Sequence, residues 1–347
     1  MKKFAVLAVF AAVSVTAQAQ SAVTLFGTLD VNARYVKNGD NTLKSLSTDG
    51  ATSSRFGVRG VEDLGDGLQA GFWLESGLAA DQGTAGDAKT SKFWNRRSTV
   101  SIQGNFGEVR LGRDTVPTYL GASDYDAFGT AGVATGDKFI TTQKFGTAVD
   151  TLKRADNQIS YFTPNSLGGF YGRASVAAGE GTAGKKYIGG RAGYAKGPLD
   201  VSLSYGQTTV APAATGDDKY KLFALGASYD FSVVKLSGYY TQTKYATQKL
   251  AVFNLGAQVP VSQAGVVRVS YVNANASTSD TTNTNDGHQF AIGYLHNLSK
   301  RTALYATVAK VSNGTAGAYN VVSSSTLPSL AAGQSSTGYE FGVRHSF

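Results

Sequence analysis

The chain has 347 residues, including 42 Gly, 18 Tyr and 18 Phe, and it contains no Cys. Without Cys it can form no disulfide, no thiolate metal site and no Cys nucleophile. Its formal net charge is +8. Lys and Arg are nevertheless spread along the chain rather than gathered in the short basic runs that bind nucleic acid, so no nucleic-acid partner is expected.

Residues 1–19 have the pattern of an export signal. Lys2 and Lys3 precede the apolar run 4–15, and small residues suited to cleavage follow it. The apolar run is too short to cross a bilayer as a helix, and no stop-transfer pattern follows, so a retained anchor is the less favoured alternative. We expect a cleaved signal peptide at 1–19 and a mature domain at 20–347.

The dominant pattern in the rest of the chain is an alternation of apolar and polar residues. It is clear over 23–35, 68–78 and 251–259, where one face carries mostly Val, Leu, Phe and Ala and the other carries mostly polar residues. Each of these segments predicts a β-strand with one apolar and one polar face. No run reaches the roughly 18 apolar residues of a transmembrane helix, so a helical membrane protein is excluded.

The connections between the predicted strands alternate strictly between short and long. The short ones lie at 63–67, 105–107, 165–169, 196–198, 230–232, 262–265 and 297–301. The long ones lie near 38–53, 80–94, 114–153, 179–186, 207–218, 244–249, 275–287 and 313–336. Seven short and eight long connections join sixteen strands, with both termini on the side of the short turns.

This asymmetry distinguishes between two all-β folds. A soluble sandwich also shows alternation, but short turns on one side, long loops on the other and an even strand number are typical of an antiparallel transmembrane β-barrel. Lipid cannot hydrogen-bond an open sheet edge, so such a sheet must close. Ten tyrosines near strand ends are interpreted as an interfacial girdle: Tyr187, Tyr194, Tyr205, Tyr220, Tyr229, Tyr239, Tyr240, Tyr271, Tyr294 and Tyr305.

The last segment, 338–347, places Tyr339, Phe341, Val343 and Phe347 on one face. We expect it to be the final strand and to close the barrel against the first. Its aromatic end, Phe347, is predicted to be the terminal signal that barrel-assembly machinery reads during biogenesis.

The connection at 114–153 is the longest, and it has no sustained periodicity. A loop this long inside a compact β domain is usually functional, disordered or wrongly assigned. We interpret it as a third external loop that folds into the lumen of the barrel, where it would limit what can pass.

Four segments, 21–36, 53–77, 95–114 and 154–170, carry motifs of which SRFGVRGVEDLGDGL and FGEVRLGR are the most specific. They resemble the general trimeric porins of bacterial outer membranes, and in particular the betaproteobacterial, anion-preferring type. The resemblance extends over essentially the whole mature chain. It implies a sixteen-stranded barrel, a homotrimer and a third loop that forms an eyelet.

The resemblance also implies a ladder of arginines on the barrel wall that faces the eyelet loop. Matched by motif, these are Arg55, Arg96 and Arg154. Fixed cations in a narrow pore favour anions, and Arg stays charged at any physiological pH. Alternation independently places Arg55 and Arg59 on the lumen face.

The assignment of Arg96 conflicts with the alternation. If Val100 and Ile102 face outward, Arg97 rather than Arg96 faces the lumen. A bulge in the strand would reconcile the two, and the motif match favours Arg96.

Other charged residues are candidates for the lumen, either in permeation or as rim charges and ion-pair partners: Arg59, Arg97, Arg110, Arg113, Glu62 and Glu75. Within the long loop, Asp124 and Asp126 are the acidic candidates for facing the arginines, and a solvated turn is the alternative for both. Because the loop has few acidic residues, the arginines should dominate and the pore should prefer anions.

An enzyme is not expected. The chain has three His residues, His288, His296 and His345, with no accompanying nucleophile signature. Its glycines form no phosphate-binding motif. We expect no cofactor and no metal site.

The sequence therefore predicts a diffusion porin of the bacterial outer membrane that passes small anionic or neutral hydrophilic solutes. It would form a homotrimer surrounded by outer-membrane lipid and lipopolysaccharide. One alternative is a substrate-specific channel for organic acids or phosphate, with a saturable site on the same arginines. Another is a structural adhesin that acts through its external loops, although the loop at 314–336 has few charges or aromatic residues.

Overall fold

A computed structural model describes residues 22–87, 90–142, 144–278, 286–322 and 327–347. The predicted signal peptide at 1–19 lies outside these residues. Among the described helices, none is long and apolar enough to cross a membrane.

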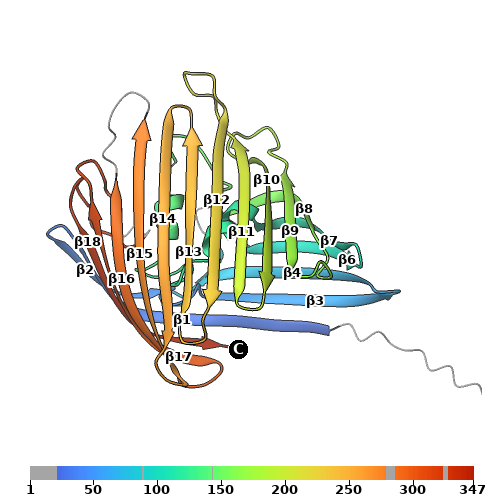
Figure 1. The fold of residues 1–347 in the computed structure, drawn as a ribbon, viewed down its shortest axis with the longest axis horizontal. Helices are drawn as coiled ribbons and strands as arrows, with labels where there is room; N and C mark the ends of the chain where they lie inside the picture. Colours follow the sequence, from blue (N-terminus) through green and yellow to red (C-terminus); the bar gives the residue numbers. More distant parts are fainter. Residues whose placement is uncertain (1–21, 88–89, 143, 279–285, 323–326) are drawn as a thin grey trace, which may run out of the picture.

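The described residues form long strands and two short helices (Figure 1). The strands are β1 (Ala22–Asn38), β2 (Asn41–Thr48), β3 (Arg55–Gly65), β4 (Leu68–Ala79), β5 (Thr84–Ala85), β6 (Arg97–Gly104), β7 (Gly107–Thr115), β8 (Arg154–Phe162), β9 (Phe170–Ala177), β10 (Lys186–Lys196), β11 (Leu199–Thr209), β12 (Lys219–Asp230), β13 (Lys235–Tyr245), β14 (Gln248–Pro260), β15 (Gly265–Thr278), β16 (Gly287–Asn297), β17 (Thr302–Asn313) and β18 (Ser336–Ser346). The helices are α1 (Pro117–Ser123) and α2 (Asp137–Thr141).

The strands form one antiparallel sheet that closes on itself. β1 pairs with β18 on one side and with both β2 and β3 on the other. Because β2 and β3 follow each other along β1, together they occupy one position in the wall, and the short β5 only adds to the end of β4. The predicted closed barrel of sixteen antiparallel strands is therefore confirmed.

The final strand closes the barrel against β1 as expected, and Phe347 adds two backbone hydrogen bonds at the point of closure. The backbone N–H of Gly27 donates to the carbonyl of Phe347 at 3.2 Å, and the N–H of Phe347 donates back at 3.0 Å. The ring of Phe347 lies directly over Gly27, where an added Cβ would be 2.3 Å from the ring and 2.9 Å from the carbonyl oxygen of Arg55. Glycine is thus required at this position for the close approach of the chain end.

The predicted alternation is confirmed along the wall. Val23 and Leu25 on β1 and Phe253 and Leu255 on β14 are about half exposed or more on the outer surface. Asn254, between the last two, is fully buried on the inner side. An apolar outer band of this kind is what lipid contact requires.

Two of the predicted long connections are wrong. β1 and β2 are joined by Gly39 and Asp40 alone, and β13 and β14 by Ala246 and Thr247 alone. Gly39 and Ala246 have φ values of 56° and 49°, the left-handed conformation of tight hairpins. The error has a simple cause, because these strand ends carry mostly polar residues and therefore resemble loops in the sequence.

Four of the ten predicted girdle tyrosines are also wrong, since they face inward and are buried: Tyr187, Tyr220, Tyr239 and Tyr305. Position near a strand end does not determine which face a residue occupies. Tyr205, Tyr229, Tyr271 and Tyr294 are exposed on the outer surface, as expected.

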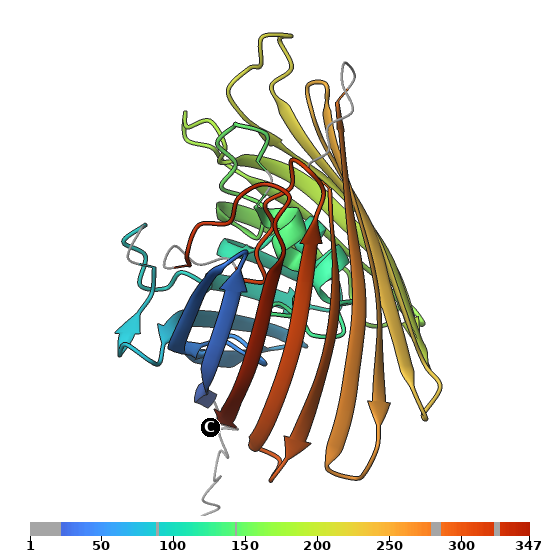
Figure 2. The ribbon, with the colours of Figure 1, turned by 90° about the vertical axis from the view of Figure 1, so that its left-hand side faces the viewer.

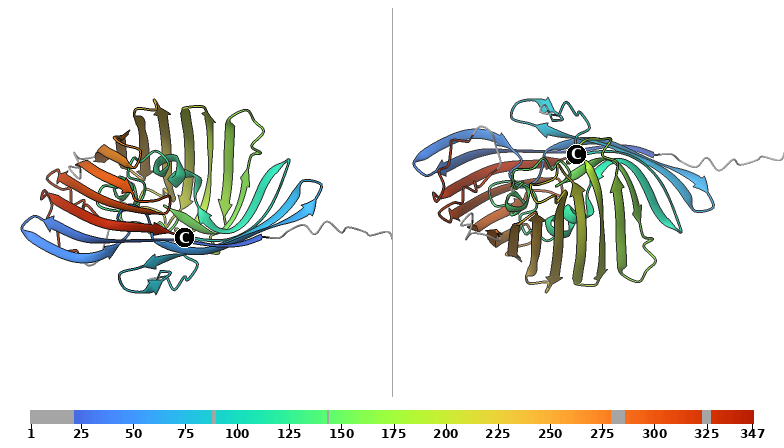
Figure 3. Two further views of the ribbon diagram at one scale, coloured as in Figure 1. Left: turned by 90° about the horizontal axis from the view of Figure 1, so that it is seen from below. Right: turned by 90° about the horizontal axis from the view of Figure 1, so that it is seen from above.

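The long connection after β7 contains two short helices, which the sequence pattern did not reveal because neither is long enough to show a helical period. Pro117 starts α1 at a position where its missing N–H costs nothing. α1 contacts β10, β11, β12 and β13. Seen along the barrel, both helices lie within the ring of strands (Figure 3).

Candidate functional site

The inner wall carries a cluster of charged side chains around Glu75 of β4. Arg96 Nε lies 2.5 Å from Glu75 Oε1, and Arg55 Nε lies 4.0 Å from the same oxygen. Trp73 Nε1 donates to the other carboxylate oxygen at 3.1 Å. The structure thus brings two of the predicted ladder arginines to a single acidic residue.

Arg154, the third predicted ladder residue, begins β8 and joins the same cluster. Its charge is attracted by Glu75 and repelled by Arg96 and Arg113. Its Nε is buried and has no hydrogen-bond partner. The cluster therefore holds three arginines against one carboxylate, and one arginine retains an unused buried donor.

Both candidates in the Arg96 and Arg97 ambiguity reach the inner side. Arg97 is the first residue of β6 and lies on its inner face, while Arg96 precedes the strand and is not subject to alternation. Arg97 stacks on Trp73 at 4.4 Å and donates to Thr99 at 3.0 Å, whereas Arg96 binds Glu75. No bulge is needed, because Arg96 lies before the first residue of β6.

Arg59 extends this cluster toward the short-turn side. Its guanidinium lies 5.0 Å from the ring of Trp73 and 5.4 Å from that of Phe26. Trp73 therefore contacts both Arg59 and Arg97 through cation–π interactions, which hold the two cations in place without neutralising them.

Arg110 and Arg113 are neutralised by neighbouring carboxylates. Arg110 forms a two-point contact with Glu108 at 2.8 Å and a second ion pair with Asp114 at 2.7 Å. Arg113 pairs with Asp156 at 2.7 Å. These two residues are ion-pair partners, which was one of the two readings the sequence left open.

Glu62 does not belong to the lumen, contrary to the prediction. It pairs in register with Ala70, which in turn pairs with Ile102, an exposed residue of the outer face. Strict alternation from Arg59 along β3 places Glu62 on the outer side. The prediction treated it as a lumen carboxylate on charge alone and did not count positions along the strand.

The two acidic loop candidates are directed away from the arginine cluster. Asp124 pairs with Arg191 of β10 at 2.5 Å. Asp126 is buried and accepts the backbone N–H groups of Phe128 at 2.9 Å and Gly136 at 2.7 Å. Burial raises the pKa of Asp126 to about 7. Asp126 thus serves the internal structure of the loop.

An apolar patch on the inner wall, which the sequence did not predict, anchors the loop. Val252, Val272 and Val311, on β14, β15 and β17, are completely buried and belong to one cluster with Val133 and Phe139 of the loop. In a water-filled barrel the inner positions are usually polar. These apolar inner positions are buried in one cluster with residues of the loop.

A buried lysine links this loop to the last long connection. Lys138 Nζ donates to the carbonyl of Val133 at 2.9 Å and to that of Val321 at 2.7 Å. Burial lowers the pKa of Lys138 to about 7. Lys153 pairs with Asp137 at 2.6 Å, which secures the end of the loop near Arg154.

A family model described as Gram-negative porin matches residues 5–316. The chain is a Gram-negative porin. It is 42% identical to the outer membrane porin protein 32 of Delftia acidovorans, with all of both chains covered. A Bordetella pertussis outer membrane porin is 28% identical over 84% of this chain and 89% of its own. The porin is accordingly an outer-membrane protein.

Solved structures agree with this assignment. The porin matches the anion-selective porin from Comamonas acidovorans with a TM-score of 0.83 and 39% identity, over 94% of this chain and 100% of that one. OmpT of Vibrio cholerae, in its trimer form, matches with a TM-score of 0.67 and 16% identity, over 94% and 99% of the two chains. That second likeness supports the fold alone.

The loop of the porin lies between two open spaces. On the long-loop side, a cavity of about 340 Å³ is lined by charged residues that include Arg34, Asp137, Lys138 and Lys153. On the short-turn side, a cleft of about 580 Å³ is lined by Leu120 of the loop together with wall residues.

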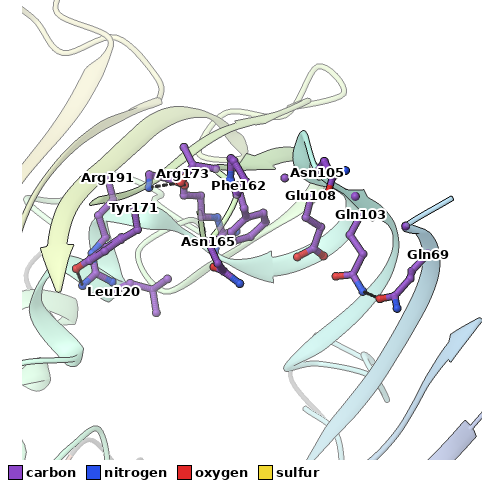
Figure 4. Close-up of a pocket in the computed structure, with 16 residues that line it drawn as sticks. Gln69, Gln103, Asn105, Glu108, Leu120, Phe162, Asn165, Tyr171, Arg173 and Arg191 are labelled. Carbon is purple, nitrogen blue, oxygen red and sulfur yellow. Dashed lines mark hydrogen bonds between the residues drawn. The ribbon is translucent and has the colours of Figure 1, made fainter. Parts of the chain in front are cut away.

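Figure 4 shows the short-turn cleft, where the cations are already engaged. Arg173 stacks on Phe162 at 4.7 Å, and Arg191 is held by Asp124 and by the hydroxyl of Tyr171 at 3.1 Å. Across the described residues of the porin, no group of His, Asp and Glu is placed to hold a metal ion.

Proposed function

We propose that this porin is a passive diffusion channel whose narrowest part prefers anions. The observation that carries the proposal is the pairing of Arg55 and Arg96 with the single carboxylate of Glu75, with the charge of Arg154 close enough to interact with Arg96 and Glu75. Fixed cations in a narrow, partly desolvated pore act more strongly on a passing ion than they would in bulk water. The cluster would enrich small anions and leave neutral solutes to be selected by size.

The segment 116–153 is the proposed constriction loop. Its support is the apolar anchoring on β14, β15 and β17, the contacts of α1 with β10–β13, and the open spaces on its two sides. In this arrangement the loop sets the width of the passage and the opposite wall sets its charge.

The balance of charge in this region also favours anions. A loop carboxylate facing the arginines would create a transverse field and weaken the preference. Asp124 is instead engaged by Arg191, and Asp126 is buried. The similar Comamonas acidovorans protein is described as anion-selective.

The test is the reversal potential of single channels in a salt gradient, for the wild type and for Arg55→Ala, Arg96→Ala and Arg154→Ala. A unit charge at about 4 Å contributes about 1 kcal/mol in water, with opposite sign for anions and cations, so each change should lower the anion-to-cation permeability ratio by about 25-fold. Arg301→Ala, in an exposed short turn, is the matched control. A reversal potential of cation sign in the wild type, or no change in all three variants, would refute the proposal.

A saturable anion site is the second candidate function. Its support is the excess of arginine charge around Glu75, where Arg55 and Arg96 share one carboxylate and Arg154 lies close by, because a bound carboxylate or phosphate would balance that excess. Block of the chloride current by millimolar organic acid or phosphate, lost in Arg154→Ala, would favour it. A conductance linear in salt without block would favour the general diffusion channel.

The assembled state belongs to the same proposal. The mature chain would begin after the signal at 1–19 and form a homotrimer in outer-membrane lipid and lipopolysaccharide. Phe347, held at the barrel seam against Gly27, would first be the residue that the assembly machinery reads. Cross-linking of the folded protein and the yield of a Phe347 deletion test these two points.

A further inference from the structure

The inner wall at β3, β4 and β6 carries two arginines without an acidic partner in the described part of the chain. Arg59 is exposed and forms no hydrogen bond and no ion pair there. Arg97 donates from its Nε to Thr99 at 3.0 Å, and its two terminal nitrogens have no hydrogen-bond partner among the same residues. The carboxylates that act on the charge of Arg97 are already paired with other arginines: Glu75, Glu108 and Asp114.

Trp73 determines the spacing of these two arginines. The guanidinium of Arg59 lies 5.0 Å from its ring and that of Arg97 lies 4.4 Å from it, so the two cations are no more than about 10 Å apart. In Figure 2 this wall, drawn in blue to cyan, lies across the barrel from the yellow strands β12 and β13. Two free guanidinium groups are therefore within reach of a single bound molecule.

The next inward row toward the short turns consists of small residues. Gly71 and Ser101 pair there in register. Among the described residues, an added Cβ at Gly71 would meet only the hydroxyl of Ser101 at 3.2 Å and a backbone oxygen at 3.6 Å. At Gly57, on the other side of Trp73, the same atom would lie 2.4 Å from the ring of Phe26. The position over Gly71 is thus uncovered, whereas the one over Gly57 is filled.

An aromatic edge and a pair of amides border this uncovered position. Trp73 Nε1 donates to Glu75 at 3.1 Å, so the opposite, carbon edge of the indole is turned toward Gly71, which precedes it on the same face. On the short-turn side Gln103 Nε2 donates to Gln69 Oε1 at 2.6 Å. The two amides also line the cleft in Figure 4. Gln69 and Trp73 are four residues apart, roughly 13 Å along the strand, which leaves room for one six-membered ring between them.

The chemistry of this arrangement suits an aromatic acid. A ring over Gly71 would present its face to the carbon edge of Trp73, which is a favoured geometry for two aromatic groups. A carboxylate on that ring would reach the flat donors of Arg59 or Arg97, and charge-assisted hydrogen bonds of this kind are the strong ones. A small inorganic anion would use the two cations but not the aromatic edge.

We propose that the wall around Trp73 binds aromatic monocarboxylates, with the ring over Gly71 and the carboxylate on Arg59 and Arg97. The amides of Gln69 and Gln103 would bind a hydroxyl group on the ring, which favours hydroxybenzoates. The inference rests on the proposed passage of solutes through the lumen, to which it adds a class of solute that is held on the way, but not on the proposed preference for anions.

The experiment uses the full-length protein in detergent, with affinity measured by calorimetric titration. The chain has two tryptophans, so W94F leaves Trp73 as the source of tryptophan emission and reports where a ligand binds. The probes are benzoate, 4-hydroxybenzoate and cyclohexanecarboxylate, which has the same charge and a similar size but no aromatic ring. Three variants are compared: R59Q, G71V, which covers the open position without changing charge, and the control R301Q in an exposed short turn. Heat-modifiability on gels verifies that each is folded.

We expect benzoate to bind saturably, to change the emission of Trp73, and to bind about fivefold more tightly than cyclohexanecarboxylate. The affinity for 4-hydroxybenzoate should be higher still. R59Q should lose at least about tenfold in affinity, because it removes a charged donor, G71V should lose saturable binding, and R301Q should match the wild type. Equal affinities for benzoate and cyclohexanecarboxylate, or binding that leaves Trp73 emission unchanged, would overturn the proposal. So would a loss in R301Q as large as that in R59Q, or full affinity in both R59Q and G71V.

Reversal potentials in a chloride gradient, recorded on the same samples, keep this inference separate from the proposed function. A channel that prefers cations but binds benzoate at Trp73 would refute the anion preference alone. An anion-preferring channel that binds no benzoate would refute the aromatic-acid site alone.

Discussion

Glu75 accepts a hydrogen bond from Arg96 at 2.5 Å, and this pair lies within the cationic cluster of the inner wall. Arg55 approaches the same carboxylate oxygen to 4.0 Å, and Trp73 holds the other oxygen. The carboxylate therefore has two opposite effects, since it holds the arginines at the wall and cancels one of their charges. Separating these effects gives the first test of the cluster.

Replacing Glu75 with Gln should make the pore more selective for anions. The change removes one negative charge from a group of three arginines and keeps the size of the side chain. At a separation of about 4 Å the electrostatic gain for an anion is about 1 kcal/mol in water, with an equal loss for a cation, or about 25-fold in the permeability ratio. Reversal potentials in a salt gradient measure it. Glu62→Gln is the matched control and should have no effect, because Glu62 lies on the outer face.

Replacing Lys138 with Met should loosen the proposed constriction loop. The change leaves the carbonyls of Val133 and Val321 without their donor, and a buried unsatisfied polar group costs about 1–3 kcal/mol. We expect higher open-channel noise and faster proteolysis within 116–153, with the barrel intact by heat-modifiability on gels. Lys144→Met, at an exposed position of the same loop, should leave both unchanged. Equal behaviour of the two variants would show that Lys138 does not hold the loop.

Much of the fold could be predicted, because β-strands in a barrel wall express their two environments directly as alternation. On β1 the apolar Val23 and Leu25 are exposed on the outer surface. On β14 Phe253 and Leu255 are exposed in the same way. The rule fails where the lumen is not water. Val252 and Val272 face inward and are apolar because the loop packs on them, so the pattern there resembles an ordinary buried strand.

The sequence indicated residues of the candidate site but not their partners. Motif matching indicated Arg55, Arg96 and Arg154, and the structure brings them together; their role in permeation stays a prediction. The ion pairs of Arg113 with Asp156 and of Arg191 with Asp124 join residues far apart in the sequence, and no local signal reveals them. Burial of Asp126 could not be predicted either, since it depends on the path of the loop.

Replacing Gly27 with Ala should weaken closure of the barrel. The added Cβ would lie 2.3 Å from the ring of Phe347 and 2.9 Å from a backbone oxygen, so the ring or the strand must move. Crowding of this kind costs about 1–3 kcal/mol. The expected result is a lower yield of heat-modifiable folded protein and a lower denaturant midpoint. In the matched control Gly71→Ala the nearest contact is 3.2 Å, to a serine hydroxyl, and yield should be nearly unchanged.

The attachment of the proposed constriction loop should depend on pH and be weakest near neutrality. Asp126 has a pKa of about 7 in the docked loop and 3.8 ordinarily, so docking becomes less favourable as the pH rises from about 4 to 7 and then stays constant. Lys138 has a pKa of about 7 when docked and 10.5 ordinarily, so docking becomes less favourable as the pH falls from about 10 to 7. Together the two effects make docking of the loop least favourable near pH 7.

Open-channel noise of single channels at pH 5, 7 and 9 measures this dependence, and wild-type noise should peak at pH 7. Asp137 acts electrostatically on both residues, and Glu340 acts on Lys138. The noise peak at pH 7 therefore reflects the titration of these neighbouring charges together. In Lys138→Met only the titration of Asp126 is left. Its noise should be as high at pH 9 as at pH 7 and should fall only toward pH 5. A wild-type noise that changes in one direction across the three pH values would contradict the paired titration.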